Sequence, residues 1–191
     1  QAQLVRERAA NSALRDVAQA LGSLNDLDGL LALVLGKSAY LVHAERATLF
    51  LLDDEGVALE SRHVVGERVQ TIRLSIGQGI AGSVVKTGKT IRVDDAYADK
   101  RFNRSWDLVT GYRTRSILAS PMKNHQGKTI GVLQVLNKEG GQPFSKDDEA
   151  LLNSLATQAA ISIDNARLLI SVMHKNAQLK QAHDQLEQKI A

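Results

Sequence analysis

The chain has 191 residues, enough for one domain with appendages at its ends. Hydrophobic residues make up 43% and charged residues 24%, which is ordinary for a globular domain and excludes a disordered chain. The absence of cysteine excludes a disulfide, a thiolate nucleophile, a cysteine-based zinc site and a thioether-linked chromophore.

The composition also limits the partners. A net charge of +3 with only 4% aromatic residues gives little basis for a groove that binds nucleic acid. No apolar run approaches the roughly 20 residues that a membrane-spanning helix needs. We therefore expect no nucleic-acid partner and no membrane partner. A chain without cysteine fits a reducing compartment, so we expect a cytoplasmic location.

The first predicted element is a helix from about residue 3 to residue 24. Its stripe is formed by Leu14, Val17, Leu21 and Leu24. Asp26 or Asp28 can cap a second helix, whose apolar residues are Leu30, Leu31, Val34 and Leu35. We assign residues 1–26 to a signalling or dimerisation helix. The sequence starts within this helical pattern, so we expect a fragment of a longer protein.

The middle of the chain is expected to form strands joined by turns. The predicted strands cover residues 48–52, 58–64, 71–76, 91–93, 116–122 and 129–137. Ile72, Leu74 and Ile76 alternate with polar residues and are expected to face inward. A short helix over 80–86 should end at the C-cap glycine Gly88. Residues 94–114 are expected to form a long irregular loop, of the kind that is usually functional or disordered.

The last predicted element is a long helix. Ser145 and Asp148 have the spacing of a capping box, and neither proline nor glycine follows Pro143. Over about three heptads the later part has coiled-coil spacing, in Leu169, Val172, Asn176, Leu179, His183, Leu186 and Ile190. An amphipathic helix that packs on its own domain is the alternative. Helical ends around a central antiparallel sheet predict an α+β fold.

Gly77, Gly79 and Gly82 have the spacing of a dinucleotide-binding fingerprint. We reject a Rossmann fold because the preceding strand alternates, the following helix is short and no βαβ repeat surrounds it. The segment still suits an anion, since glycines allow close backbone approach and a helix N-terminus offers N–H groups. A simple turn and cap is the alternative.

Residues 94–115 combine many polar groups with the only tryptophan, Trp106. Such a loop can form one wall of a pocket for an anionic, partly aromatic ligand, or it can be a solvated loop. The five histidines are scattered, and none forms a metal-binding motif. We therefore expect a binding domain and no catalytic activity.

Seven short strings within residues 27–169 carry a family resemblance, at residues 47–53, 79–82, 87–88, 95–98, 101–102, 110–115 and 130–132. With these strings, residues 27–169 resemble a GAF domain. The resemblance implies a GAF-like α+β fold, in which an antiparallel sheet of about six strands is packed with helices and flanked by long terminal helices. Residues 170–191 then form a coiled-coil helix leading to an effector domain outside this sequence, and a parallel homodimer through the terminal helices is expected.

Five residues match the signature of GAF domains that bind cyclic nucleotides in phosphodiesterases and bacterial adenylate cyclases. They are Asn137, Lys138, Phe144, Asp148 and Glu149. The resemblance implies that they support the pocket without touching the ligand. A Lys138–Asp148 ion pair would tie the end of the last strand to the start of the long helix, and Phe144 would fill their junction. A carboxylate at Asp148 also suits a helix N-terminus.

The resemblance also implies ligand-binding positions. It puts a base-recognising hydroxyl at Thr48, with Arg46 two residues earlier, and the phosphate near the backbone N–H groups of Ile80 and Ala81. The lid positions are Asn103, Asp107, Thr110 and Thr114. Gln134 replaces a carboxylate that is frequent on the last central strand.

The choice between cAMP and cGMP as the expected ligand depends on single residues and short strings. Arg62-His63 stands where cGMP-binding members carry Phe-Asp, and the Gln134 amide can present a donor or an acceptor to a purine. Arg46-Ala-Thr48, as in the bacterial cyclases, favours cAMP over cGMP. The alternatives are a ligand-free GAF linker that dimerises, or a GAF sensor of another small molecule such as haem or an amino acid. Methionine sulfoxide reduction by GAF domains uses cysteine, which this chain lacks.

Overall fold

The computed structural model describes residues 27–65 and 71–190. The helix predicted from about residue 3 to residue 24 lies outside the described residues. So does Asp26, one of the two candidate caps of the second helix. The elements in chain order are α2 (Leu27–Leu41), β1 (Ala44–Leu52), β2 (Ala58–Val65), β3 (Arg73–Ser75), α3 (Gly79–Thr87), β4 (Ile91–Val93), α4 (Ser105–Thr110), β5 (Ile117–Lys123), β6 (Thr129–Lys138), a 3-10 turn (Glu139–Gly141) and α5 (Lys146–Ile190).

One six-stranded sheet organises these elements, in the order β3-β2-β1-β6-β5-β4. Each neighbouring pair is antiparallel. The predicted α+β architecture with a central antiparallel sheet is therefore confirmed, and the rejection of a parallel Rossmann sheet holds. Because side chains alternate along a strand, the central strands β1 and β6 each present one set of residues to either face.

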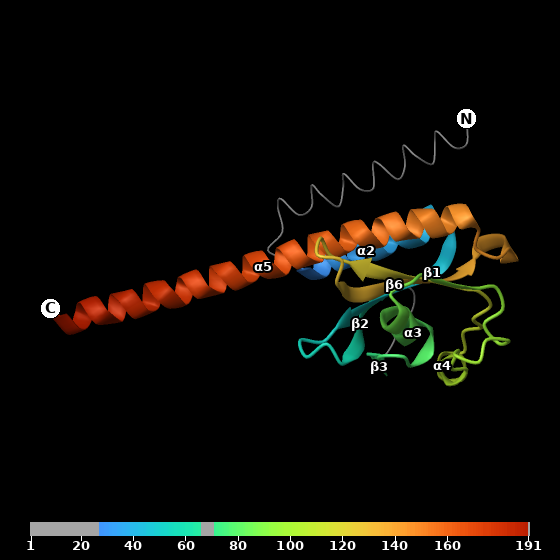
Figure 1. Cartoon of the computed structure of the whole chain (residues 1–191), viewed down its shortest axis with the longest axis horizontal. Helices are drawn as coiled ribbons and strands as arrows, with labels where there is room; N and C mark the ends of the chain where they lie inside the picture. Colours follow the sequence, from blue (N-terminus) through green and yellow to red (C-terminus); the bar gives the residue numbers. More distant parts are fainter. Residues whose placement is uncertain (1–26, 66–70, 191) are drawn as a thin grey trace, which may run out of the picture.

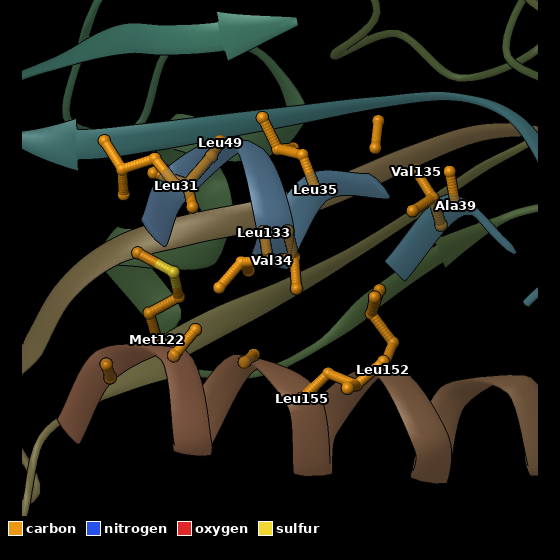
Figure 2. Close-up of a cluster of buried hydrophobic side chains, with 14 of the residues drawn as sticks. Leu31, Val34, Leu35, Ala39, Leu49, Met122, Leu133, Val135, Leu152 and Leu155 are labelled. Atoms are coloured by element: carbon orange, nitrogen blue, oxygen red, sulfur yellow. The ribbon is translucent and has the colours of Figure 1, made fainter. Parts of the chain in front are cut away.

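The first face of the sheet packs against α2 and α5 (Figure 1). Figure 2 shows Leu31 and Leu35 of α2 beside Leu49 and Leu133 of the sheet, with Leu152 from α5 in the same core. The four apolar residues predicted for the second helix, Leu30, Leu31, Val34 and Leu35, are all buried. Burying each such side chain contributes about 1.5–3 kcal/mol, so this layer is the main core.

The second face of the sheet is covered by α3 and by residues 94–116, which we call the lid. A smaller apolar cluster lies here, around Phe50, Val84, Ile117 and Val132. The predicted end of α3 is confirmed, because Gly88 has a φ of 63° and its N–H donates to the Val84 carbonyl. The ligand-binding residues predicted in α3 and in the lid therefore lie on the face of the sheet opposite α5.

Two expectations about this face are wrong. Ile76 does not face inward: it is 40% exposed, because β3 ends at Ser75 and the chain turns through Gly77. The lid is not irregular throughout, because it contains α4. Asn103 favours this short helix by accepting a hydrogen bond from the Ser105 N–H at 3.0 Å, and Gly111 ends it with a φ of 68°.

The start of α5 confirms the capping box. The Ser145 N–H donates to Asp148 Oδ2 at 2.8 Å, and the Asp148 N–H donates to Ser145 Oγ at 3.1 Å. Further along, the helix extends beyond the sheet (Figure 1). The stripe predicted for a coiled coil is exposed there, with Leu169 at 51% and Leu179 at 68%. Pairing of this stripe with a second helix stays a prediction.

Gly131 marks the tightest approach between β1 and β6, and its substitution by alanine should destabilise the fold. A Cβ atom at this position would collide with the Phe50 carbonyl oxygen and lie 2.7 Å from Met122 Cε. We expect Gly131→Ala to lower the free energy of unfolding by about 3 kcal/mol, measured by urea denaturation. Gly36→Ala in α2, where nothing lies within 4 Å of the added atom, is the control and should stabilise by about 0.5–1 kcal/mol. Equal stability of Gly131→Ala and wild type would contradict this packing.

Candidate functional site

A cavity lies between the second face of the sheet and the lid. Its volume of ≈ 130 Å³ is far above the roughly 10–15 Å³ that one water molecule needs, so it has room for part or all of a small ligand. The lining comes from β1, β3, β5, β6, the start of α3 and the lid. It consists of Arg46, Thr48, Phe50, Ile72, Leu74, Gly79, Ile80, Ala81, Phe102, Asn103, Trp106, Asp107, Thr110, Tyr112, Thr114, Ile117, Gln134 and Leu136.

All nine residues predicted to bind a ligand lie in this lining: Arg46, Thr48, Ile80, Ala81, Asn103, Asp107, Thr110, Thr114 and Gln134. The structure thus brings together positions that are up to 88 residues apart in sequence (134 minus 46). The geometry makes them neighbours of one cavity, while contact with a ligand stays a prediction. The hydrogen-bond partners of these nine residues differ from one residue to another.

The floor of the cavity carries two polar side chains that have no hydrogen-bond partner among the described residues. Thr48 on β1 pairs with Gln134 on β6, so both lie on the same face of the sheet. Thr48 is 4% exposed, and neither side chain is hydrogen-bonded to any described residue. Neither is a fully buried polar group without a partner, so their polar atoms are open to the cavity. A molecule in the cavity can therefore donate to them or accept from them.

The N-terminus of α3 forms a second side of the cavity. Ile80 and Ala81 lie in its first turn and are buried. The N-cap residue Gln78 makes no side-chain capping hydrogen bond, and the first N–H groups of a helix have no partner within it. These groups carry the positive end of the helix dipole, which favours an anion.

The lid holds its predicted polar residues by internal hydrogen bonds. Asp107 accepts from the Thr114 hydroxyl and from the Thr114 N–H, both at 2.7 Å, and from the Tyr97 hydroxyl at 3.0 Å. Asn103 accepts from the Ser105 N–H, and the Thr110 hydroxyl donates to the Trp106 carbonyl. These side chains thus brace the lid, unlike the unpartnered Thr48 and Gln134.

Aromatic rings complete the wall of the cavity. Trp106 lies there as the sequence predicted, together with Phe102 and Tyr112, which sequence reasoning missed. The Arg46 guanidinium lies 3.7 Å from the centre of the Tyr112 ring, a cation–π contact. The sequence signal that could have identified Phe102 and Tyr112 was the presence of aromatic residues in an otherwise polar loop. Phe50 and Leu136 were also missed, although they follow from alternation with Thr48 and Gln134.

The predicted Lys138–Asp148 ion pair is confirmed. Lys138 Nζ lies 2.8 Å from Asp148 Oδ1 and also donates to the Val42 carbonyl at 2.8 Å. Phe144 is buried at the junction, 2% exposed, within the core beneath α2 and α5. This group of contacts, which we call the brace, fixes the end of β6 to the start of α5.

The other two residues of the signature lie beside the brace. Asn137 is fully buried, and its Oδ1 accepts from the N–H groups of Arg115 at 2.6 Å and Ser116 at 3.2 Å. Glu149 lies on the first turn of α5, 3.9 Å from the Arg92 guanidinium. None of the five signature residues lines the cavity.

Because of the brace, the free energy of unfolding should depend on pH in the acidic range. Burial raises the pKa of the Asp148 carboxyl, but hydrogen bonds from Lys138 and Ser145 outweigh it and hold the pKa below its ordinary value of 3.8. Its contribution to stability is therefore complete above that value and is lost as the pH falls through the lower pKa of the folded state. We expect Asp148→Asn to cost about 2 kcal/mol at neutral pH and the gap from wild type to close in acid, by urea unfolding. A gap that stays constant with pH would contradict this account.

No group of three or more histidine, aspartate or glutamate side chains is placed to hold a metal ion within residues 27–65 and 71–190. No helix in that part of the chain combines the length and apolar character needed to cross a membrane.

Comparison with known proteins gives a consistent family. The sequence model of the GAF domain matches residues 26–163. The dual 3′,5′-cyclic-AMP and -GMP phosphodiesterase 11 of Drosophila melanogaster is 42% identical over 102 residues, 53% of this chain and 7% of that protein. The cGMP-specific 3′,5′-cyclic phosphodiesterase of Drosophila virilis is 36% identical over 171 residues, 81% of this chain and 19% of that protein. The chain thus spans a small part of the length of these relatives.

A third relative and a solved structure are also similar to this chain. The probable 3′,5′-cyclic phosphodiesterase pde-5 of Caenorhabditis elegans is 32% identical over 178 residues, 86% of this chain and 24% of that protein. The GAF domain from a phosphoenolpyruvate-protein phosphotransferase of Coxiella burnetii has a TM-score of 0.73 at 24% identity, covering 86% of this chain and 98% of that one. The structural likeness supports the fold, and the sequence relatives are phosphodiesterases.

Proposed function

This chain belongs to the GAF domain family, and from that premise we propose that it binds a cyclic purine nucleotide, cAMP in preference to cGMP, in the cavity beneath the lid. The domain is regulatory, and no catalysis is assigned to it. Relatives named as cyclic-nucleotide phosphodiesterases support this choice of ligand class.

The observation that carries the proposal is the arrangement, around one cavity, of an aromatic wall, two floor side chains without a partner among the described residues, and a helix N-terminus. A cyclic nucleotide has an aromatic base with polar edges and a phosphate with one negative charge. The base matches the unpartnered Thr48 and Gln134 and the aromatic lid, and the phosphate matches the N–H groups at Ile80 and Ala81. Asn103, Asp107, Thr110 and Thr114 then set the shape of the lid.

The preference for cAMP rests on Arg46 and Thr48, whose spacing on β1 resembles that of the bacterial cyclase domains. Thr48 and Gln134 are neutral, so the floor offers no carboxylate to accept from the guanine N1–H and exocyclic amine. The Gln134 amide can pair with adenine or with guanine and does not itself choose between them. Arg46, held against Tyr112, adds a donor at the same end of the cavity.

Occupancy reaches the rest of the protein through α5 in this proposal. Nucleotide binding orders the lid, and the lid ends at β5, next to the brace that begins α5. The exposed stripe of α5 joins two chains in a parallel homodimer, and an effector domain follows outside this sequence. A monomer by light scattering at micromolar concentration would remove the dimer from the proposal.

Thr48→Val tests the floor of the cavity with a change of similar size. We expect about tenfold weaker binding of cAMP, the equivalent of one hydrogen bond, with stability unchanged or slightly raised because the unpartnered hydroxyl is gone. Fluorescence of Trp106, the only tryptophan, is the readout in a cAMP titration. The control is Ser154→Val on the exposed side of α5, which should bind as wild type does. Unchanged affinity in Thr48→Val would contradict base recognition at this floor.

A further inference from the structure

Glu45, the second residue of β1, is a centre of hydrogen bonding outside the cavity lining. Its Oε2 accepts from the Tyr112 hydroxyl at 2.9 Å and from Asn137 Nδ2 at 3.0 Å. Its Oε1 forms an ion pair with the Arg115 guanidinium. One carboxylate thus receives three donors from two segments that lie 67 to 92 residues away in sequence.

Asn137 completes this arrangement from the other side. Its Nδ2 also donates to the Arg113 carbonyl at 2.8 Å, while its Oδ1 accepts from the backbone N–H groups of Arg115 and Ser116. Asn137 has a φ of 54°, a left-handed conformation that asparagine tolerates. Glu45 and Asn137 together therefore fasten residues 112–116, the segment by which the lid returns to the sheet.

The hydrogen bond from Tyr112 to Glu45 also affects the cavity. Tyr112 lines the cavity, and the same ring lies against the Arg46 guanidinium. A phenol anchored at its hydroxyl has its outer end held in place, and a guanidinium stacked on the ring is restrained with it. Burial, with the neighbouring Glu45 carboxylate, raises the pKa of Tyr112 far above its ordinary value of 10.0, so the phenol stays a hydrogen-bond donor.

Electrostatics favour a charged Glu45. Burial raises the pKa of its carboxyl, but hydrogen bonds from Asn137, Tyr112 and Arg115 outweigh it and lower the pKa below 4.5. Hydrogen bonds to an ionised acceptor are about twice as strong as neutral ones. The carboxylate is therefore a stronger anchor for the lid than an amide would be.

We propose that Glu45 is a positioning residue of the nucleotide site, which holds the returning arm of the lid and, through the Tyr112 hydroxyl, sets the Tyr112–Arg46 pair at the cavity. The identity of the ligand in this inference rests on the function proposed above. The anchoring of the lid by Glu45 does not depend on that function. Because Asn137 precedes Lys138 of the brace, Glu45 also ties the lid to the strand end from which α5 begins.

The test uses Glu45→Gln, Tyr112→Phe and the double variant. Each single change should weaken cAMP binding about tenfold by calorimetry, and the double variant should be no weaker than the poorer single one, since Glu45→Gln weakens and Tyr112→Phe removes the same contact. In the ligand-free protein, acrylamide quenching of Trp106 should increase in Glu45→Gln, because the lid opens more often. Multiplied losses in the double variant would overturn the route through Tyr112.

The control is Asp53→Asn, at the opposite end of β1. Asp53 also pairs with an arginine, Arg73 at 3.0 Å, and accepts from backbone N–H groups, but it lies away from the lid. It should change neither the cAMP affinity nor the quenching of Trp106. Wild-type quenching in Glu45→Gln would overturn the inference whether or not nucleotide binds. Failure of wild type to bind cAMP or cGMP would instead refute the proposed ligand and leave the quenching result to decide the role of Glu45.

Discussion

Replacing Ala81 by glutamate is expected to weaken cyclic-nucleotide binding at least about 100-fold, because a like charge placed against the phosphate costs several kcal/mol. Ala81 is 2% exposed and lies in the first turn of α3, in the wall of the cavity. The cavity gives the new side chain room and a carboxylate suits the start of a helix, but Ala81 belongs to an apolar cluster, so the variant is first shown to be folded by urea unfolding. Calorimetric titration with cAMP measures the loss.

Thr87→Glu is the matched control for this prediction. It adds the same charge to the same helix, but Thr87 is exposed at the far end of α3 and does not line the cavity. We expect its affinity for cAMP to stay within about twofold of wild type, because a distant exposed charge is screened by salt. Similar affinities for Ala81→Glu and wild type would remove the phosphate from this end of the cavity.

Lys138→Met should be the most damaging change to stability, at about 3–5 kcal/mol by urea unfolding, because it takes the Lys138 ammonium away from a buried carboxylate. Asp148 is 2% exposed, and the side chain of Lys138 is only 14% exposed. Lys138 also satisfies the Val42 carbonyl, which would lose its charged donor. Methionine keeps most of the side-chain volume, so the loss reports the charge and its hydrogen bonds.

The double variant Lys138→Met, Asp148→Leu separates an unpaired charge from a lost attraction. With both charges removed, most of the stability should return, apart from about 1 kcal/mol for the helix cap that Asp148 provides to Ser145. A double variant less stable than Lys138→Met, or a single variant within about 1 kcal/mol of wild type, would contradict the role given to the brace.

Local patterns predicted much of the fold. The alternation of strands, the capping box at Ser145 and the C-cap at Gly88 each depend on residues within a few positions, and all three are confirmed. Where a local pattern was followed too far, it failed. Alternation along residues 71–76 placed Ile76 inside, but the turn at Gly77 ends the strand first.

The site was predicted in part. Resemblance to a family located nine positions that the structure places around one cavity, because a family motif carries spatial information that periodicity lacks. Hydrogen-bond partners across long separations were beyond this reasoning. Asp107 lines the cavity, and contact with a ligand stays a prediction, but its hydrogen bonds from Thr114 and Tyr97 were not foreseen. The partners of Glu45 were not foreseen, because nothing in the sequence pairs one carboxylate with a tyrosine 67 residues away.

Isothermal titration of the purified chain with cAMP, cGMP and 5′-AMP tests the central claim most directly. We predict saturable binding of cAMP, weaker binding of cGMP, and much weaker binding of 5′-AMP, whose open phosphate carries extra charge and lacks the ring. No heat from any of the three, with protein verified to be free of bound nucleotide, would contradict the claim and leave a GAF domain that links and dimerises without a nucleotide.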